Sequence, residues 1–426
     1  MSRQVLQIPP DPALEPLKIR DFLGIKETVF AFFLLAGMFK AVPGLEDSPI
    51  DLTILTALIT LGFVVYRAWR HKERRYGALF LLLGFYVAFL PTLLWTNWHD
   101  YAIEKASRFY TLTLVATITP LYLIRTSRDL RRFSCAFASL SAVTVACALV
   151  SLLTAGKDLE RLVALSATTI GLARAMGVLL LFLATWWFKS GEHYFIVAAS
   201  LVLFGVLLVA VGERGPMIAT AVVFASIYVL FRRDAWRGIM KACFLIVAVL
   251  GVSRIGVAWL PESSLLRVQS FFGGEFGTSE YERADFFSFS WRYILEHPLG
   301  VGLGGFADLY GANRSTDRVF PHNIVLETFV EGGWMAGIYL LGLSWLALRR
   351  AYSLAMVLKA RLECQFLFCM FLFFLINEQV SGELNDSKAF FAFMALCIGL
   401  VSKTNEKAES SSSYFRAPAL RPANIS

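Results

Sequence analysis

The chain has 426 residues, of which 57% are hydrophobic and 17% charged, with a mean hydropathy of +0.60 and a net charge of +8. Soluble globular domains rarely combine so much apolar sequence with so few charges, so that class of protein is excluded. The basic excess lies in short loops between apolar runs, which argues against nucleic-acid binding and for a membrane orientation signal.

The apolar runs predict an all-α polytopic membrane protein with about twelve transmembrane helices, since each run approaches the 17–25 residues that cross a bilayer. Residues 1–26 are polar and Pro-rich and lack a cleavable signal pattern, so we expect a cytoplasmic N-terminal segment followed by an uncleaved first span. The predicted spans are 27–45, 50–68, 77–96, 109–124, 133–154, 170–188, 194–211, 216–231, 242–260, 323–348, 366–380 and 388–402.

Lysine and arginine are concentrated in every second loop, including 67–75, 125–132, 232–241 and 349–361. The positive-inside rule then predicts that both termini are cytoplasmic and that the long loop 261–322 lies outside. The transmembrane domain is thus expected to cover 27–402, this loop included. Residues 403–426 are rich in Ser, Ala and Pro, which predicts a disordered cytoplasmic tail.

Charged residues inside spans are costly and are therefore candidates for function. On this topology Arg174, Glu213, Arg214, Glu327 and Glu378 fall towards the outer side, so we expect them to share an outer pocket. Within this set, Glu213-Arg214-Gly215-Pro216 predicts a tight turn before a helix, because proline suits the first helical turn. Arg214 beside a helix N-terminus would form an anion site, although both charges could simply cap the turn.

The long outer loop contains arginine but no lysine: Arg267, Arg283, Arg292, Arg314 and Arg318. Arginine forks match paired phosphate oxygens, so the loop favours a phosphate ligand. Its many aromatic residues predict short helices folded onto the membrane surface. The stretch Gly300-Val301-Gly302-Leu303-Gly304 follows no strand, so we expect close backbone packing there and not a nucleotide loop. His297, before Pro298, is interpreted as a turn residue.

His322 stands where this loop meets an apolar helix and is followed by Asn323. Histidine can move a proton near neutral pH, so the functional interpretation is a general base; the alternative is interface packing. Glu327 and Glu331 share one helix face, and either could orient the imidazole. No His or Cys cluster has metal-ligand spacing, so we expect neither a metal nor a cofactor.

Three blocks of sequence resemble the bacterial O-antigen ligase/polymerase superfamily. The first is Pro321-His322-Asn323, followed by Leu326 and Glu331-Gly332. The second runs from Arg283 through Trp291 to His297-Pro298-Leu299-Gly300-Val301-Gly302, and the third is Glu213-Arg214-Gly215. The resemblance covers roughly 200–345, while the N-terminal half is similar by architecture only.

The resemblance implies a membrane glycosyltransferase of GT-C type in the bacterial inner membrane, with its active site facing the periplasm. Such ligases take a glycan from undecaprenyl diphosphate and pass it to the lipid A–core of lipopolysaccharide, whereas related polymerases pass it to another carrier-linked glycan. His322 would be the catalytic residue, and Arg214 and Arg283 would bind the diphosphate. The candidate substrate-binding residues are Arg174, Arg292, Glu213, Asn323, Glu327 and Glu331.

Two questions stay open at this point. The stretch 171–177, which contains Arg174, matches the family poorly, so the type of acceptor is undetermined. The same residues would serve a polymerase, although the chain length and the moderate outer loop favour the ligase. A non-enzymatic transporter is a third alternative, which would show Gly/Pro-broken helices at matching positions of two halves.

Overall fold

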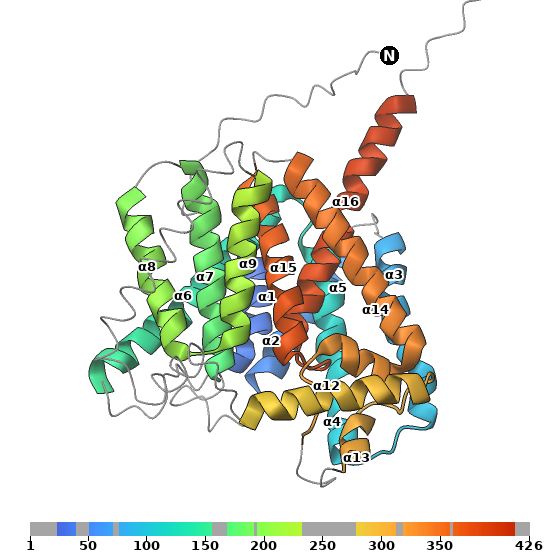
Figure 1. Ribbon diagram of the computed structural model, residues 1–426. Helices are drawn as coiled ribbons and strands as arrows, with labels where there is room; N and C mark the ends of the chain where they lie inside the picture. The colour runs from blue at the N-terminus through green and yellow to red at the C-terminus, as the bar shows by residue number, and fades with distance from the viewer. Residues whose placement is uncertain are drawn as a thin grey trace, which may run out of the picture.

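The computed structural model describes residues 24–39, 51–70, 76–155, 168–190, 194–231, 278–311, 318–357 and 361–413. Within these ranges every regular element is a helix and no strand occurs, which confirms the all-α prediction (Figure 1). The predicted span 242–260 lies outside the described residues, as do Arg267 and Arg314.

The N-terminal half is a series of helices that run up and down the bundle. They are α1 (Ile25–Leu35), the 3₁₀ turn η2 (Ala36–Phe39), α2 (Leu52–Arg70), α3 (Tyr76–Phe89), the 3₁₀ turn η3 (Leu90–Leu94), α4 (Asp100–Arg108), the π-helix η4 (Phe109–Thr113), α5 (Leu114–Leu123), α6 (Ser127–Ala155), α7 (Thr169–Ser190) and α8 (Tyr194–Val211).

The C-terminal half completes the bundle and adds the elements that cross its end. They are α9 (Arg214–Phe231), α12 (Thr278–Glu296), α13 (Gly305–Tyr310), α14 (Ile324–Val357), α15 (Leu362–Ser381) and α16 (Lys388–Ser413). Helix α16 continues to Ser413, beyond residue 402, where the sequence analysis ends the last span. Residues 414–426 of the predicted disordered tail lie outside the described residues.

The predicted spans that fall within the described ranges all lie on helices. Five of the described helical segments are long and apolar enough to cross a membrane: Leu52–Arg70, Tyr76–Leu94, Ser127–Val150, Ile324–Met356 and Leu362–Ser381. Shorter apolar helices include Thr169–Thr185, Ala199–Leu208, Arg214–Ile227 and Lys388–Leu400. The chain is therefore a multi-helix membrane protein, and the number of about twelve spans stays a prediction.

Interlocking phenylalanine rings pack the bundle where α3, η4 and α16 meet. Phe85, Phe89, Phe109 and Phe391 are buried, and their ring centroids lie 5.1–5.9 Å apart. Within a membrane, helices associate by such close packing because the lipid removes the usual hydrophobic gain. Each aromatic pair contributes about 0.5–1.5 kcal/mol beyond its buried area. This packing fixes the helices that carry the polar end of the bundle.

One end of the bundle, the lower end in Figure 1, gathers the segments that the sequence analysis singles out. Helices α7, α9, α14 and α16 begin there, α15 ends there, and α12 crosses below them. The first residues of a helix leave backbone N–H groups free and carry the positive end of its dipole. The N-termini of α7, α9, α14 and α16 therefore bring backbone donors to this end of the bundle.

Helix α14 is broken near its start, at Gly333, where φ is 73° and ψ is −177°. The segment 298–302 docks against the break and hydrogen-bonds to the backbone groups that it frees. These bonds join Val301 N to Val330 O (2.9 Å), Gly302 N to Glu331 O (3.0 Å) and Trp334 N to Pro298 O (2.9 Å). Few backbone hydrogen bonds are therefore lost at the break. The first turns of α14 run in a different direction from the rest of the helix.

Glycine is required on both sides of this contact. Gly300 also has a positive φ, 77°, and a Cβ at Gly333 would lie 2.5 Å from the carbonyl carbon of Leu299. No side chain fits between backbones at that distance, and L-residues rarely adopt these angles. The expectation of close backbone packing in the Gly300–Gly304 stretch is confirmed.

Candidate active site

A cavity of about 390 Å³ lies at this end, which is within the usual size of small-ligand sites. Its walls come from α1, η2, α7, α15, the start of α16 and the turn before α14. Three of the predicted residues line it together: Arg174, His322 and Glu378. The other polar walls are Glu383, Asp386, Ser387 and Lys388.

His322 has an unusual backbone conformation, with φ at 55°, and no other non-glycine residue in the described ranges has a positive φ. Such a conformation costs on the order of 1–3 kcal/mol and is found preferentially at functional sites. Its half-buried ring lies 4.2 Å from the ring of Phe320 and 6.1 Å from that of Phe286, measured between centroids. The fold therefore holds the imidazole in place at the cavity wall.

Asn323 caps α14 directly after the histidine. Its Oδ1 accepts hydrogen bonds from the backbone N–H groups of Val325 (2.9 Å) and Leu326 (3.0 Å), and its Nδ2 donates to Gln379 O on α15 (3.1 Å). These contacts make Asn323 an N-cap that joins the start of α14 to α15. The start of α14, directly after His322, is thereby fixed to the end of α15.

His322 is neutral at physiological pH. Burial, and then the positive charge of Arg283, lower the pKa of His322 to about 4. A neutral imidazole has a free lone pair that can accept a proton. Arg283 reaches this region because it shares a face of α12 with Phe286, which contacts the histidine ring. Arg292 follows nine residues later, about half a turn around the helix, and is exposed.

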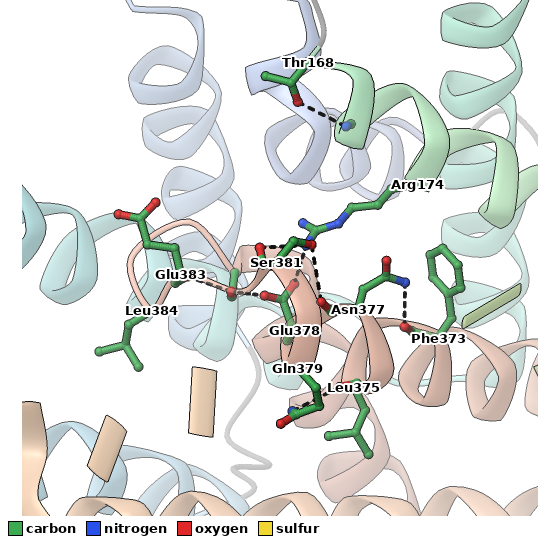
Figure 2. A network of polar contacts seen from close by, with 12 residues as sticks. Thr168, Arg174, Phe373, Leu375, Asn377, Glu378, Gln379, Ser381, Glu383 and Leu384 are labelled. Carbon is green, nitrogen blue, oxygen red and sulfur yellow. Dashed lines mark hydrogen bonds and ion pairs between the residues drawn. The ribbon is translucent and has the colours of Figure 1, made fainter. Parts of the chain in front are cut away.

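Arg174 lies at the far wall of the cavity, held by the end of α15 (Figure 2). Its Nη2 donates to Ser381 Oγ (3.0 Å) and Ser381 O (3.3 Å) and lies 3.4 Å from Glu378 Oε1. Glu378 Oε2 also accepts a hydrogen bond from Ser387 (2.5 Å). Arg174 Nε is buried without a hydrogen-bond partner among the described residues, so part of its donor capacity is available.

The Glu213-Arg214 turn lies beside the cavity without lining it. Gly212, with φ at 71°, ends α8, and Arg214 begins α9, as the sequence pattern predicts. Glu213 Oε1 accepts a hydrogen bond from Thr169 Oγ1 at the start of α7 (2.5 Å). A Cβ at Gly215 would lie 3.3 Å from Val380 on α15. The turn is therefore packed against two helices that form the cavity wall.

Glu327 and Glu331 are paired with a lysine on α4. Lys105 Nζ lies 2.5 Å from Glu327 Oε1 and 2.6 Å from Glu331 Oε1, and all three side chains have 0% exposure. Glu327 Oε2 also accepts a hydrogen bond from Leu384 N (2.9 Å). The structure records no bond from either glutamate to His322 in the described residues. The glutamates are thus joined to Lys105, and the proposed orientation of the imidazole by them finds no support in these contacts.

Comparison of the sequence with models of known protein families gives a match. Residues 199–341 match the O-antigen ligase family. The matched segment contains Glu213, Arg214, Arg283, His322 and Asn323, and the resemblance seen in the sequence is thereby confirmed for it. No curated protein matches the chain. The family match and the apolar helices together support a multi-pass membrane enzyme of the O-antigen ligase and polymerase type.

Three further charged residues, Lys105, Glu383 and Lys388, lie at or near the site and are not among the candidates that the sequence analysis names. Lys105 lies between two predicted spans, where a loop charge is expected, but Tyr101, Lys105 and Phe109 recur at four-residue spacing and so share one buried helix face. Glu383 and Lys388 line the cavity from the short connection between α15 and α16 and the first residue of α16. That connection has no motif, and only the tertiary fold brings it to His322.

The arginines of the outer loop are dispersed. Arg283 acts on His322, Arg292 is exposed on the opposite face of α12, and Arg318 Nη2 lies 2.7 Å from Glu104 Oε2 on α4. Only Arg283 of the described loop arginines therefore approaches the histidine.

Proposed function

We propose that the protein is an O-antigen ligase-type glycosyltransferase. It moves a glycan from undecaprenyl diphosphate to the lipid A–core of lipopolysaccharide at the periplasmic face of the inner membrane. The observation that carries this proposal is the neutral His322, held in a strained turn at a cavity wall beside Arg283 and inside the family-matched segment.

In the proposed reaction, His322 acts as general base. A hydroxyl of the acceptor sugar attacks the anomeric carbon of the donor glycan and transfers its proton to the imidazole. The bond between the anomeric carbon and the phosphate oxygen breaks, and its electron pair leaves with undecaprenyl diphosphate. Such proton transfer typically contributes 10²–10⁴-fold to the rate. A single displacement inverts the anomeric centre.

Arginines stabilise the negative charge that grows on the leaving diphosphate. We assign this role to Arg283 and Arg214, with Arg174 Nε as a further donor. Fixed donors in a partly dry site contribute a few kcal/mol to such a transition state. The bound diphosphate would also offset the charge of Arg283, one of the two causes that depress the pKa of His322. Donor binding would therefore make the histidine a stronger base.

The proposed chemistry needs no metal or cofactor, because diphosphate is already a good leaving group and arginine supplies the positive charge. Purified enzyme is expected to retain transfer activity in excess EDTA. Complete loss of activity that a divalent ion restores would contradict the arginine-based mechanism.

An O-antigen or exopolysaccharide polymerase of the same superfamily is the second candidate, since the matched family includes both reaction types. Deletion of the gene separates the two functions. Uncapped lipid A–core with long carrier-linked polymer indicates a ligase, whereas accumulation of single carrier-linked repeats indicates a polymerase. Complementation with wild-type protein, with His322→Ala and with His297→Ala tests the site. His297 is an exposed histidine of the same outer region, so His297→Ala should restore the product and His322→Ala should not.

A further inference from the structure

A second cavity, of about 840 Å³, lies on the other side of the connection between α15 and α16. It is enclosed by η2, α2, the end of α4, η4, α5 and residues 385–388. Gly37, Asp386 and Lys388 line both this cavity and the one that contains His322. The two cavities therefore share a wall, and a ligand in the second would lie next to the proposed reaction centre.

The second cavity changes character along its length. Its lining at the polar end of the bundle includes Asp51, Arg108 and Asp386, whereas Ile54, Leu58 and Leu61 line it further along α2. These three apolar side chains are 50%, 61% and 40% exposed, so they border the lipid in a membrane-embedded chain. An amphipathic ligand matches this order, with its polar part at the end of the bundle and its apolar part along α2.

Two residues of its lining, Thr53 and Asn385, each carry a buried side-chain oxygen that has no hydrogen-bond partner among the described residues: Thr53 Oγ1 and Asn385 Oδ1. Their residues are only 3% and 4% exposed, so both atoms are withdrawn from solvent. Leaving such a group unpaired costs about 1–3 kcal/mol, and buried polar atoms are nearly always satisfied. An amide oxygen and a hydroxyl are suitable partners for the hydroxyl groups of a sugar.

The backbone is also irregular at this cavity. The continuous helical stretch from Asp100 to Leu123 contains the π-helix Phe109–Thr113, from which Tyr110, Thr111 and Leu112 line the cavity. A π turn inserts an extra residue into a helix and occurs frequently at functional sites. Here the π turn supplies three of the lining residues of the cavity.

We propose that the second cavity is the acceptor subsite and binds a saccharide carried on an apolar anchor. This inference rests on the proposed function. Among the described lining residues the charges are balanced, with Arg108 and Lys388 against Asp51 and Asp386, which suits an uncharged terminal sugar of the acceptor. The sugar hydroxyls bond to Thr53 and Asn385, and the anchor lies along α2. The chain thus separates its two lipid-linked substrates across the wall formed by residues 386–388.

Two pairs of matched variants test the subsite. Thr53→Val removes the unpaired hydroxyl, and Thr60→Val is its control, because Thr60 is on the same helix, fully buried and likewise unpaired, but does not line this cavity. Leu58→Trp narrows the apolar part. Leu55→Trp is its control, because Leu55 is an exposed residue of α2 outside the cavity lining. The measurements are donor affinity, the KM for acceptor and direct acceptor binding to full-length protein in lipid nanodiscs.

We expect Thr53→Val to raise the acceptor KM and Kd about 5–10-fold, as the loss of one buried hydrogen bond predicts. Leu58→Trp should weaken acceptor binding as well, while donor affinity and both control variants stay at wild-type values. Two probes distinguish the source of the saccharide: lipopolysaccharide that ends at the core, and a single repeat linked to undecaprenyl diphosphate. The probe whose binding depends on Thr53 and Leu58 is the acceptor.

The proposal is overturned if Thr53→Val and Leu58→Trp leave binding of both probes unchanged, if they weaken the donor instead, or if Thr60→Val has the same effect as Thr53→Val. The binding measurement does not depend on turnover. If acceptor binding behaves as expected while His322→Ala keeps normal turnover, the proposed chemistry fails and the subsite stands.

Discussion

Two groups of ionisable residues at the polar end of the bundle lie in opposite surroundings. Lys105, Glu327 and Glu331 form a closed cluster in which every side chain is fully buried and both glutamates contact the lysine. Arg174 and His322 instead face a cavity, where Arg174 keeps a nitrogen unpaired among the described residues. A buried charge cluster without access to solvent or ligand can hold helices together, whereas ionisable groups that face a cavity can contact a ligand.

The closed cluster also explains how the open cavity keeps its shape. Glu327 lies in the first turns of α14, directly after His322, and also binds the backbone N–H of Leu384 in the connection to α16. Lys105 thereby joins α4, α14 and the segment that carries Glu383 and Lys388. Burial by itself would lower the pKa of Lys105. The negative charges of Glu327 and then Glu331 outweigh this effect and hold the pKa well above its usual range. The lysine stays charged, and the cluster serves as a fixed support.

The largest expected effect is the loss of turnover when His322, in the group that faces the cavity, is replaced. His322→Ala should lower turnover by about 10²–10⁴-fold, because the general base acts only as the acceptor attacks. Donor affinity and thermal stability should stay near wild-type values, which purified protein in nanodiscs would show. Near-normal turnover in folded His322→Ala protein would make the histidine a structural residue and remove the distinction between the two groups.

Removing the lysine tests the closed cluster. Lys105→Met leaves Glu327 and Glu331 buried without the basic group that pairs with both, which should destabilise the fold by about 3–5 kcal/mol in denaturant unfolding. The matched control adds Glu327→Gln and Glu331→Gln to the same chain, which removes the uncompensated charge and should recover much of the loss. If the Lys105→Met variant unfolds at the same denaturant concentration as wild type, the cluster does not stabilise the fold around the site.

Substitution of the two arginines of α12 tests whether only the face of this helix towards His322 contributes to donor binding. Arg283→Ala should weaken donor binding and turnover by about 10- to 100-fold, as expected for hydrogen bonds between charged groups. Arg283→Lys should restore part of the loss, since lysine keeps the charge but not the bidentate fork. Arg292→Ala, on the exposed face, should have a much smaller effect. Equal losses for Arg283→Ala and Arg292→Ala would mean that the donor contacts both faces of α12.

The smallest expected effect depends on pH. The pKa of His322 is lowered to about 4 in the folded protein and returns to about 6.5 on unfolding. Below the unfolded value only the unfolded chain takes up the proton, so the free energy of unfolding should decrease as pH falls from 6.5 towards 4. His322→Gln should lack this component. Arg283→Ala removes the second cause of the shift, so the acidic limb of its pH–activity profile should move to higher pH.

The all-α class, the approximate helix boundaries and the resemblance of residues 199–341 to the O-antigen ligase family could be predicted from the sequence, because they depend on local composition and on ordered motifs. The Gly300–Gly304 stretch was also interpretable locally, since glycines without a strand predict close backbone packing. His322 and Arg174 could be selected one at a time, as polar groups at the ends of apolar runs.

Which of these groups lie together depends on the tertiary packing. Glu327 and Glu331 look like partners of His322 in the sequence, yet Lys105, more than two hundred positions earlier, takes both of them. Arg283 and Arg292 both belong to the arginine-rich outer loop, and the fold places them on opposite faces of α12. The second cavity depends on Thr53, the π turn at 109–113 and Asn385, which no motif connects. A buried charge must pair with whichever opposite charge the packing brings within reach, and sequence spacing constrains that choice only within one helix.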